Sequence, residues 1–408
     1  MFIYNLFLRI AYIVFFPILY FLFRNNNFKQ RFRIKELSLT DTIWIHASSI
    51  GEVNAVKPLL LKLIRLYPRR SFVMTCMTKT GLENAKKINN KLTVLPFPFD
   101  MPHIIKRFVR VIDPSLIILV ETEIWPNLIN IAYKNKIPVA IVNGRISDKS
   151  YPRYHYTRFF WKNIFKKIMI VNAQSEKDSQ RFKSLGSKNV LNSNNLKFSC
   201  DFPEYDKSEL RKAWGFSFND IIISFGSTRP GEEKIIIDLA RQLKHEIPRL
   251  KIIVVPRHLH RINEVKKLLK RHEYSLFSEN IHDRLITIVD EMGILTQVYA
   301  LSDIAIIGGS FSNFGGHNPL EAAAYKNALI IGQYHQSCRD IVEKLHESNG
   351  IIIADENSLH QEITRLMSNI EIRKMIGNNA FNVIEANKNS IDLHINNLQE
   401  VISMKEIV

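Results

Sequence analysis

The feature that most constrains this chain is a series of short apolar runs separated by longer amphipathic stretches. Runs that are apolar throughout are typical of parallel strands covered by helices on both faces. Stretches such as Val53–Leu66 and Glu232–His245 carry apolar residues three and four positions apart, which predicts helices. The predicted strands are Thr42–Ala47, Phe72–Met77, Thr93–Pro96, Leu116–Val120, Val139–Val142 and Ile168–Asn172, then Ile221–Phe225, Lys251–Val255, Ile286–Val289, Ile304–Ile307, Leu329–Ile331 and Ile351–Ile353. Two such series predict an α/β protein with two Rossmann-like, doubly wound domains.

The length of 408 residues is enough for two domains of ordinary size. We expect one domain over residues 36–200 and a second over 209–370, with the boundary in the polar stretch Cys200–Ser208. Residues 371–408 have a helical pattern and are predicted to form a C-terminal tail. A cleft between two such domains is a natural ligand site.

The N-terminal segment Phe2–Phe23 is almost wholly apolar and aromatic, broken by Asn5, Arg9 and Pro17. Its length is that of a membrane span. Its first charge comes late and a basic stretch follows it, unlike the usual cleaved signal peptide. We therefore expect residues 1–24 to be an uncleaved anchor, with the rest on the cytoplasmic side of a membrane. The alternatives are a helix lying in the membrane interface and an ordinary buried helix.

The balance of charges favours an anionic partner. Lys and Arg number 56 against 39 Asp and Glu, a net charge of +17. Nucleic acid, acidic lipid headgroups and a phosphorylated substrate all fit this charge. Nucleic acid is the weaker option, because the sequence has no arginine-rich tail or zinc-finger pattern. The three cysteines, Cys76, Cys200 and Cys338, lie far apart, which is typical of a reducing compartment without disulfides or structural zinc.

The segment His46-Ala-Ser-Ser-Ile-Gly-Glu52 follows the first predicted strand. Glu52 is expected where the strand's carboxyl end meets a helix, the place where open α/β sheets bind ligands. A carboxylate there can act as a general base. The alternative is a capping box, in which Ser49 and Glu52 only satisfy backbone N–H groups.

Other strands are followed by polar residues in the same way. Leu116–Val120 leads into Glu121 and Glu123, which are site candidates unless they form ion pairs with a nearby arginine. In the second half, Gly226 begins the segment Gly-Ser-Thr-Arg-Pro-Gly-Glu-Glu, where Thr228 is predicted to cap a helix whose N–H groups can bind phosphate. Arg257, after the strand that ends near Pro256, can clamp a phosphate or carboxylate, or be an ordinary solvated arginine.

The stretch from Gly308 to Glu321 is rich in glycine: Gly-Gly-Ser-Phe-Ser-Asn-Phe-Gly-Gly-His-Asn-Pro-Leu-Glu. Asn318, Pro319 and Glu321 fit an N-cap, a first-turn proline and a capping partner. Capping does not account for the four glycines and His317. Glycines before a helix N-terminus favour a nucleotide or phosphate site over a plain loop.

Several common motifs are missing from the sequence. It has no Walker lysine loop, no Gly-x-Gly-x-x-Gly, no Asp-x-Asp and no Gly-x-Ser-x-Gly. No His, Asp and Cys cluster has metal spacing. These absences weaken an ATP, NAD or serine-hydrolase interpretation, and we expect neither a cofactor nor a metal.

Taken together, seven segments resemble the Kdo (3-deoxy-D-manno-octulosonic acid) transferases of lipopolysaccharide synthesis, glycosyltransferase family 30. One departure is Arg229, where many members have histidine. The segments begin, in chain order, at Trp44 (Trp-Ile-His-Ala-Ser-Ser-Ile-Gly-Glu-Val), Glu121 (Glu-Thr-Glu-Ile-Trp-Pro-Asn-Leu-Ile), Asn143 (Asn-Gly-Arg-Ile-Ser), Asn195 (Asn-Leu-Lys-Phe), Gly226, Pro256 (Pro-Arg-His) and Gly308.

The resemblance implies a GT-B glycosyltransferase with two Rossmann-like domains facing a central cleft, on the cytoplasmic face of the bacterial inner membrane. The donor would be CMP-Kdo, and the acceptor the lipid A precursor (lipid IVA). Glu52 would be the general base for inverting attack, and Glu121 and Lys197 would stabilise the transition state or bind the acceptor. The CMP site would comprise Pro256, Arg257, Met292, Gly293, Ile294, Asn318, Pro319, Leu320 and Glu321.

Two alternatives remain open. One keeps the GT-B fold but uses a UDP-sugar, either for transfer to a lipid-linked substrate or for epimerisation. The other is a membrane-tethered module that binds anionic lipid without catalysis.

Overall fold

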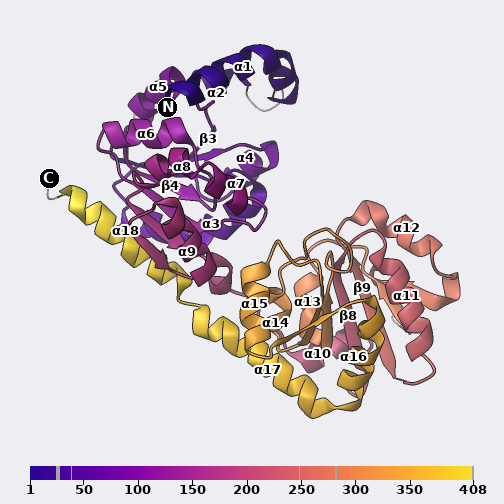
Figure 1. The fold of residues 1–408 in the computed structure, drawn as a ribbon. Coiled ribbons are helices and arrows are strands. Elements are labelled where there is room, and N and C mark those ends of the chain that lie inside the picture. The colour runs from indigo at the N-terminus through magenta and orange to yellow at the C-terminus, as the bar shows by residue number, and fades with distance from the viewer. Residues whose placement is uncertain (24–27, 38, 248, 281–282, 407–408) are drawn as a thin grey trace. The chain divides into compact units, whose positions relative to one another are not determined.

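The computed structural model describes the whole chain except residues 24–27, 38, 248, 281–282 and 407–408. The chain divides into two compact units, residues 1–199 together with 389–408, and residues 200–388 (Figure 1). The stretch predicted as one C-terminal tail is shared between them. Helix α17 (Ile370–Asn387) lies in the second unit and α18 (Ser390–Glu406) lies in the first.

The first unit is built on one parallel sheet of seven strands, in the order β3-β2-β1-β4-β5-β6-β7. The strands are β1 (Thr42–His46), β2 (Phe72–Cys76), β3 (Leu92–Pro96), β4 (Pro114–Val120), β5 (Val139–Gly144), β6 (Ile170–Ala173) and β7 (Val190–Asn192). The helices besides α18 are α1 (Phe2–Phe23), α2 (Phe28–Phe32), α3 (Ile50–Leu66), α4 (Lys79–Ala85), α5 (Pro102–Ile112), α6 (Pro126–Lys134), α7 (Tyr151–Tyr156), α8 (Arg158–Phe165), α9 (Glu176–Leu185) and the 3₁₀ turn η1 (Leu196–Ser199).

Alternate side chains of each strand enter two different cores. On β1, Ile43 and Ile45 pack with residues of α3, α4 and α18, whereas Trp44 packs with residues of α5, α6, α8 and α9. The strands are therefore buried on both faces, which is why their sequences are apolar throughout.

The second unit repeats this architecture with a parallel sheet in the order β10-β11-β9-β8-β12-β13-β14. The strands are β8 (Ile221–Thr228), β9 (Leu250–Pro256), β10 (Tyr274–Leu276), β11 (Ile286–Ile288), β12 (Ile304–Ile307), β13 (Ala328–Gly332) and β14 (Ile351–Ala354). The helices besides α17 are α10 (Lys207–Ala213), α11 (Glu232–Leu243), α12 (Ile262–Lys267), α13 (Leu295–Leu301), α14 (Leu320–Ala323), α15 (Arg339–Glu347) and α16 (Glu356–Ser368), with 3₁₀ turns η2 (Leu259–Arg261), η3 (Arg271–Glu273) and η4 (Phe277–Glu279).

The strand order of each sheet reverses next to its first strand, and in the second sheet β11 also lies out of order between β9 and β10. In the first unit the reversal lies between β1 and β4, and in the second between β8 and β12. Loops at the carboxyl ends of the two strands beside such a reversal diverge to opposite faces, and this opening is where doubly wound sheets bind ligands. The predicted α/β class with two doubly wound units is confirmed, and each unit carries one such position.

The sequence missed two strands and misplaced two helix starts. The missed strands, β7 and β10, are edge strands of three residues each. Thr228 ends β8, and α11 begins instead after Gly231, which has a φ of +97°. Pro319, not Asn318, occupies the N-cap position of α14, although the Asn318 side chain still accepts a hydrogen bond from the N–H of Leu320 at 3.2 Å.

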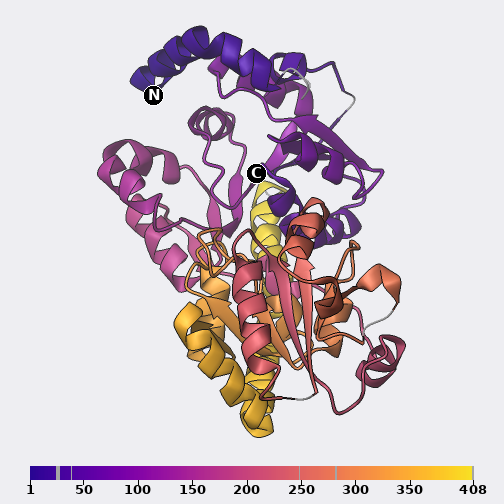
Figure 2. The ribbon, with the colours of Figure 1, turned by 90° about the vertical axis from the view of Figure 1, so that its right-hand side faces the viewer.

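Helix α1 packs on the first unit through its tyrosines. The Tyr4 hydroxyl donates to Asp100 at 2.9 Å, and the Tyr12 ring meets Phe99 edge-on at 5.0 Å. Its other side exposes large apolar residues, such as Phe2, Ile3, Phe7 and Ile13, which are 69–82% exposed. Figure 2 shows α1 as the indigo helix that begins at the N-terminus. No helix within the described part of the chain is long and apolar enough to cross a membrane. The basic stretch expected after α1 begins at Arg24, and residues 24–27 lie outside the described residues.

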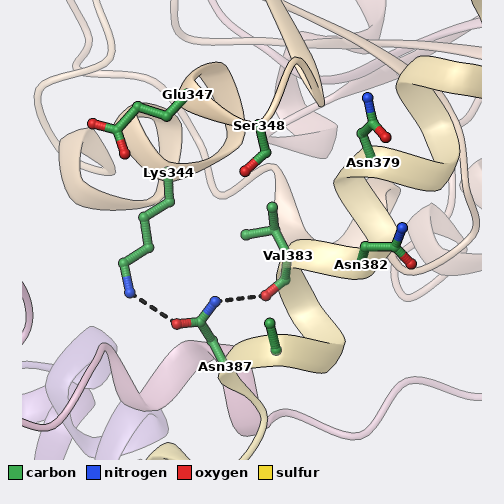
Figure 3. A pocket seen from close by; sticks show the side chains of 8 residues that line it. Lys344, Glu347, Ser348, Asn379, Asn382, Val383 and Asn387 are labelled. Carbon is green, nitrogen blue, oxygen red and sulfur yellow. Dashed lines mark hydrogen bonds between the residues drawn. The ribbon is translucent and has the colours of Figure 1, made fainter.

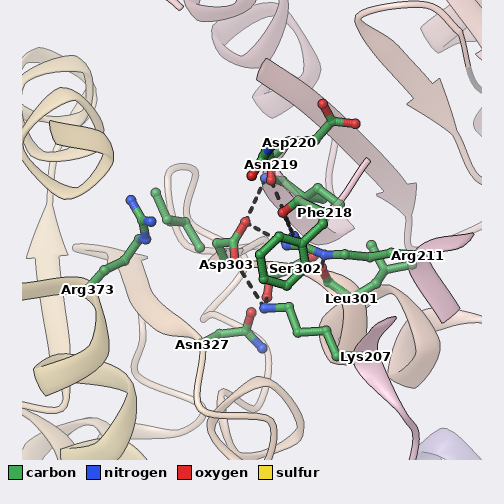
Figure 4. A network of polar contacts seen from close by, with 12 residues as sticks. Lys207, Arg211, Phe218, Asn219, Asp220, Leu301, Ser302, Asp303, Asn327 and Arg373 are labelled. Carbon is green, nitrogen blue, oxygen red and sulfur yellow. Dashed lines mark hydrogen bonds and ion pairs between the residues drawn. The ribbon is translucent and has the colours of Figure 1, made fainter. Parts of the chain in front are cut away.

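A buried ionic network joins α10 to the sheet of the second unit (Figure 4). Asp303, just before β12, accepts hydrogen bonds from Arg211 at 2.7 Å and from Lys207 at 3.0 Å. It also accepts from the backbone N–H of Ile222 at 3.0 Å. Burial alone would raise the pKa of Asp303, but Lys207 and Arg211 hold it below its usual value. The network lies at the amino ends of β8 and β12, the edge opposite the ligand-binding position, so its role is structural.

Candidate functional site

Glu52 lies in the first turn of α3, directly after β1. Ser49 is the N-cap, and its hydroxyl accepts the N–H of Glu52 at 3.4 Å. The Glu52 carboxylate accepts the Ser48 N–H at 2.7 Å and the Ser49 hydroxyl at 3.0 Å. The predicted capping role is therefore confirmed in part. It does not exclude chemistry, because the side chain remains partly exposed at the strand-order reversal.

The environment of Glu52 tunes the carboxyl group for proton transfer near neutral pH. Burial raises the pKa of Glu52 to about 7, the charges of Glu123 and Glu121 add to this effect, and the Ser48 and Ser49 hydrogen bonds oppose it. A general base is most effective when its pKa lies near the working pH. The three carboxylates come from both strands that flank the reversal.

Two aromatic side chains hold the Glu123 carboxylate in place by hydrogen bonds. His46 Nε2 donates to Glu123 Oε2 at 3.1 Å, and Trp125 Nε1 donates to the same oxygen at 3.0 Å. His46 is fully buried and stacks on Phe97 at 3.8 Å. Its Nδ1 lies 2.9 Å from the Thr75 carbonyl oxygen and 3.1 Å from the Thr75 hydroxyl. Glu121 differs, because it follows β4 with a φ of +57°, the left-handed region that few non-glycine residues adopt. Its strained position at the strand end is typical of functional sites.

Lys197 lies on η1, which packs against α3. The turn is tied to the end of β5, where Asn143 accepts the N–H of Leu196 at 3.0 Å. Asn195 holds the turn from within by accepting the N–H of Lys197 at 3.0 Å. Lys197 therefore belongs to the same carboxyl edge of the sheet as Glu52 and Glu121.

In the second unit, a buried carboxylate organises the glycine-rich loop. Glu232, 3% exposed, accepts the N–H groups of Gly309 at 2.8 Å, Ser310 at 2.9 Å and Phe311 at 3.0 Å. It also accepts the N–H of Arg229 at 2.8 Å. Glu232 therefore already uses these three N–H groups, and the nucleotide or phosphate site expected at this stretch stays a prediction. Helix α14 also has only four residues, so its dipole contributes little.

Cationic and imidazole side chains gather beside this loop instead. Arg229 Nε donates to His317 Nε2 at 3.4 Å, and Arg229 Nη1 lies 3.0 Å from His258 Nε2. Arg257 acts electrostatically on His317, and its backbone N–H donates to Thr228 at 3.1 Å. We call Arg229, Arg257, His258 and His317 the cation cluster. Its members come from the loops after β8, β9 and β12, at the strand-order reversal of this unit.

The other predicted donor residues fall into two sets. Glu321, in the first turn of α14, lies near enough to Arg257 that the arginine lowers its pKa, although burial has the larger effect and raises it. Pro256 ends β9 next to Arg257, and Asn318, Pro319 and the buried Leu320 lead into Glu321. Met292, Gly293 and Ile294 precede α13, and Met292 is 72% exposed.

A separate hollow of about 340 Å³ lies between α15 and α17 (Figure 3). It is lined mainly by asparagines and by Lys344, which donates to Asn387 at 2.9 Å. Neither helix directly follows a strand beside the reversal, so this hollow is not part of the candidate site. Within the described chain, no group of three or more His, Cys, Asp or Glu side chains is placed to hold a metal ion.

Sequence reasoning missed the roles of His46 and Glu232. Both lie inside segments that were singled out, but each acts on a partner 77 positions away: His46 on Glu123, and Glu232 on Gly309. The only local signal for Glu232 was an acidic residue at a helix start, which predicts capping. The unexplained His317 was a better signal, since it proves to lie in the cation cluster.

Comparisons with known proteins identify the family. Residues 26–200 match the family model described as 3-deoxy-D-manno-octulosonic-acid transferase (Kdo transferase). A 3-deoxy-D-manno-octulosonic acid transferase from Haemophilus influenzae is 33% identical over 364 residues, covering 86% of this chain and 84% of that protein. A bifunctional glycosyltransferase/methyltransferase from Fusobacterium nucleatum is 39% identical over 338 residues, covering 79% of this chain but only 52% of that protein.

A likeness to a solved structure supports the fold. A glycosyltransferase from Rickettsia africae matches with a TM-score of 0.60 at 14% identity, covering 90% of this chain and 98% of that one. Identity at that level speaks for the fold alone, whereas the Haemophilus influenzae relative is 33% identical and is matched over 84% of its length. The chain therefore belongs to the Kdo transferase family of glycosyltransferases.

Proposed function

We propose that this chain transfers Kdo from CMP-Kdo to a lipid A precursor, lipid IVA, with inversion at the sugar and with Glu52 as the general base. The observation that carries the proposal is the placement of Glu52. Its carboxylate is partly exposed at the strand-order reversal of the first unit, where burial, aided by two neighbouring carboxylates, raises its pKa to about 7. A group of that pKa is a proton acceptor suited to neutral solution.

The base accepts the proton of an acceptor hydroxyl while the oxygen attacks the anomeric carbon of the donor. The bond from that carbon to the phosphate oxygen breaks, and its electron pair leaves with CMP. Glu121 and Lys197, at the same sheet edge, are proposed to orient the acceptor or stabilise the transition state. Because Glu52 already accepts two hydrogen bonds, its carboxylate is held in place before the acceptor arrives.

The donor is proposed to bind at the cation cluster of the second unit. Phosphate esters are bound well by arginine, whose fork of N–H groups matches phosphate oxygens. Glu321, beside Arg257, is proposed to accept hydrogen bonds from the ribose hydroxyls of CMP. Met292, Gly293 and Ile294 are proposed to line the site of its cytosine ring. A leaving group that is already a phosphate is stabilised by these cations as negative charge develops on it.

We also propose that α1 binds the cytoplasmic surface of the inner membrane. Its exposed aromatic and aliphatic side chains form a larger apolar surface than soluble monomers usually leave uncovered. Such helices bind at the membrane interface, and a net charge of +17 favours anionic lipid. Flotation with vesicles containing anionic lipid tests this proposal. The natural chain should float, and a chain with Phe7→Ser and Ile13→Ser should remain mostly at the bottom.

Product analysis tests donor and acceptor together. The purified chain is incubated with lipid A precursor and either CMP-Kdo or UDP-N-acetylglucosamine, and products are measured by mass spectrometry. The proposal predicts addition of Kdo mass with the first donor and no sugar addition or epimerisation with the second. Turnover of the UDP-sugar alone would favour the UDP-dependent alternative. No reaction with either donor, in a chain that still binds anionic vesicles, would favour the binding module.

A further inference from the structure

The cation cluster gathers arginine and histidine side chains with little opposing charge. Arg229 bridges two imidazoles, His317 at 3.4 Å and His258 at 3.0 Å, and also lies over the Phe314 ring at 5.4 Å. The Glu232 carboxylate already accepts backbone N–H groups of the loop, and Glu321 faces Arg257. An anion is the ligand that would complete this cluster.

The direction of the hydrogen bond from Arg229 shows which form of His317 this structure holds. A guanidinium has donors and no acceptor, so His317 Nε2 must accept from Arg229 and carries no proton. The ring is half-buried against Gly309, where an added Cβ would lie 3.0 Å from His317 Cδ2. Burial lowers the pKa of His317 to about 4, and the charges of Arg257, Arg229 and His258 act in the same direction. The accepting Nε2 and the lowered pKa both indicate a neutral His317 at physiological pH.

A bound phosphate would change both the hydrogen bond from Arg229 to His317 and the charges that lower the pKa of His317. It attracts the Arg229 guanidinium, which binds phosphate more strongly than imidazole, and so frees His317 Nε2. A negative charge within a few ångströms also favours the protonated imidazole. We propose that His317 takes up one proton from solvent when the donor's phosphate binds, and that its new Nε2–H then donates to a phosphate oxygen. This inference rests on the proposed donor site.

The consequence for transfer is electrostatic. When the bond from the sugar to phosphate breaks, the electron pair moves to the phosphate oxygen, and the His317 N–H hydrogen bond stabilises the added charge. His317 would thus be a donor-binding residue that is positively charged only when the donor is bound.

Calorimetry of the full chain tests the proposal directly. The probe is the methyl ester of CMP, a phosphodiester with one negative charge throughout the range used, so any proton taken up belongs to the protein. Binding is measured at pH 6 in two non-phosphate buffers of different ionisation heat. We expect the heats to differ by an amount equal to nearly one proton per ester. Affinity should also be higher at pH 6 than at pH 7.5, because binding is linked to proton uptake.

Two variants assign the proton. His317→Gln should still bind the ester, with buffer-independent heats and an affinity that no longer depends on pH. His346→Gln, an exposed change on α15 outside the cation cluster, should retain the uptake. If the natural chain binds the ester without proton uptake, or if the uptake survives in His317→Gln, the inference is wrong while the donor site stands. If the natural chain does not bind the ester at all, the proposed donor site itself fails.

Discussion

At the scale of single residues, the surroundings of Glu52 have opposing effects on its pKa. As the residue that closes the first turn of α3 it should be an ordinary low-pKa carboxylate, because hydrogen bonds and a helix N-terminus favour its charge. Burial and two neighbouring carboxylates reverse that outcome. The folded chain therefore keeps a charged group where ionisation is costly, which is common where function requires it.

This cost predicts that Glu52→Gln stabilises the chain. The pKa of Glu52 is about 7 in the fold against an ordinary 4.5, so the folded state loses stability as the pH rises from 4.5 through 7. At pH 8 we expect the variant to be more stable by about 1–2 kcal/mol, discounted for the partial exposure of the side chain. The difference should narrow below pH 7 and vanish near pH 4.5. Urea unfolding at these pH values measures it, and equal stability at pH 8 would contradict the account.

Glu123 is predicted to set the pH dependence of activity through Glu52. Its charge helps to raise the pKa of Glu52, although burial has the larger effect. In Glu123→Gln the acid limb of kcat/KM should move to lower pH, by about half a unit. Glu176→Gln, an exposed change in the same unit, is the control and should leave the profile in place. An unchanged acid limb in Glu123→Gln would show that this carboxylate acts only through packing.

At this scale the sequence pointed to individual residues but could not supply their partners. Glu52 and Arg257 were found because each follows an apolar run. In a doubly wound sheet, the position after such a strand is where ligands bind. Glu232 was not found, because its partners are backbone N–H groups on a loop after a different strand. Nothing local distinguishes such a residue from an ordinary first-turn glutamate.

At the scale of elements, the opposite edges of the second sheet have different tasks. The carboxyl ends of β8, β9 and β12 carry the cation cluster, whereas the amino ends of β8 and β12 are tied to α10 through Asp303 (Figure 4). Asp303 accepts from two cationic side chains and from the backbone of β8.

Asp303→Ala is therefore predicted to destabilise the chain without altering the donor site. It leaves the buried Arg211 without its carboxylate, and breaking a buried pair in this way costs about 3 kcal/mol. Asp283→Asn, an exposed aspartate of the same unit, should change stability by less than about 0.5 kcal/mol. Urea unfolding compares the two. A similar small effect for both would mean that the network contributes little.

The elements themselves were largely predictable because parallel strands are buried on both faces. Such strands are apolar along their whole length, so runs like Ile304–Ile307 stand out in the sequence. The two strands that were missed lie at sheet edges. In β7 the residues Leu191 and Asn192 are exposed, so the run of apolar residues is broken. The predicted helix starts differ from the observed ones where the backbone conformation sets the first helical residue, as at Gly231 before α11.

At the scale of the whole molecule, the chain leaves the first unit at Ser199 and returns to it at Asn389. The returning helix α18 buries Ile395, Leu398, Val401 and Ile402 against the face of the sheet that also holds α3. His394 accepts the backbone N–H of Asn143 at 3.1 Å, which ties the helix to the end of β5. The sequence predicted helices here but contained no sign of which unit they would cover.

Removing residues 389–408 should therefore damage the first unit rather than trim a free tail. Four buried aliphatic side chains contribute on the order of 6 kcal/mol or more, a large part of the stability of a typical domain. We expect the shortened chain to unfold at a clearly lower temperature and to bind hydrophobic dyes. Removal of residues 403–408 alone should have little effect. Unchanged unfolding of the chain that ends at residue 388 would contradict the packing described for α18.

The central claim is that Glu52 removes the proton from the acceptor, and the most direct test is the dependence of Kdo transfer on pH and on this side chain. With CMP-Kdo and lipid A precursor, kcat/KM of the natural chain should rise with pH through about 7. Glu52→Gln should lose activity by roughly several hundred-fold or more and lose this acid limb, while Glu176→Gln behaves like the natural chain. A Glu52→Gln chain that transfers Kdo at nearly the natural rate, with the same pH profile, would contradict the account.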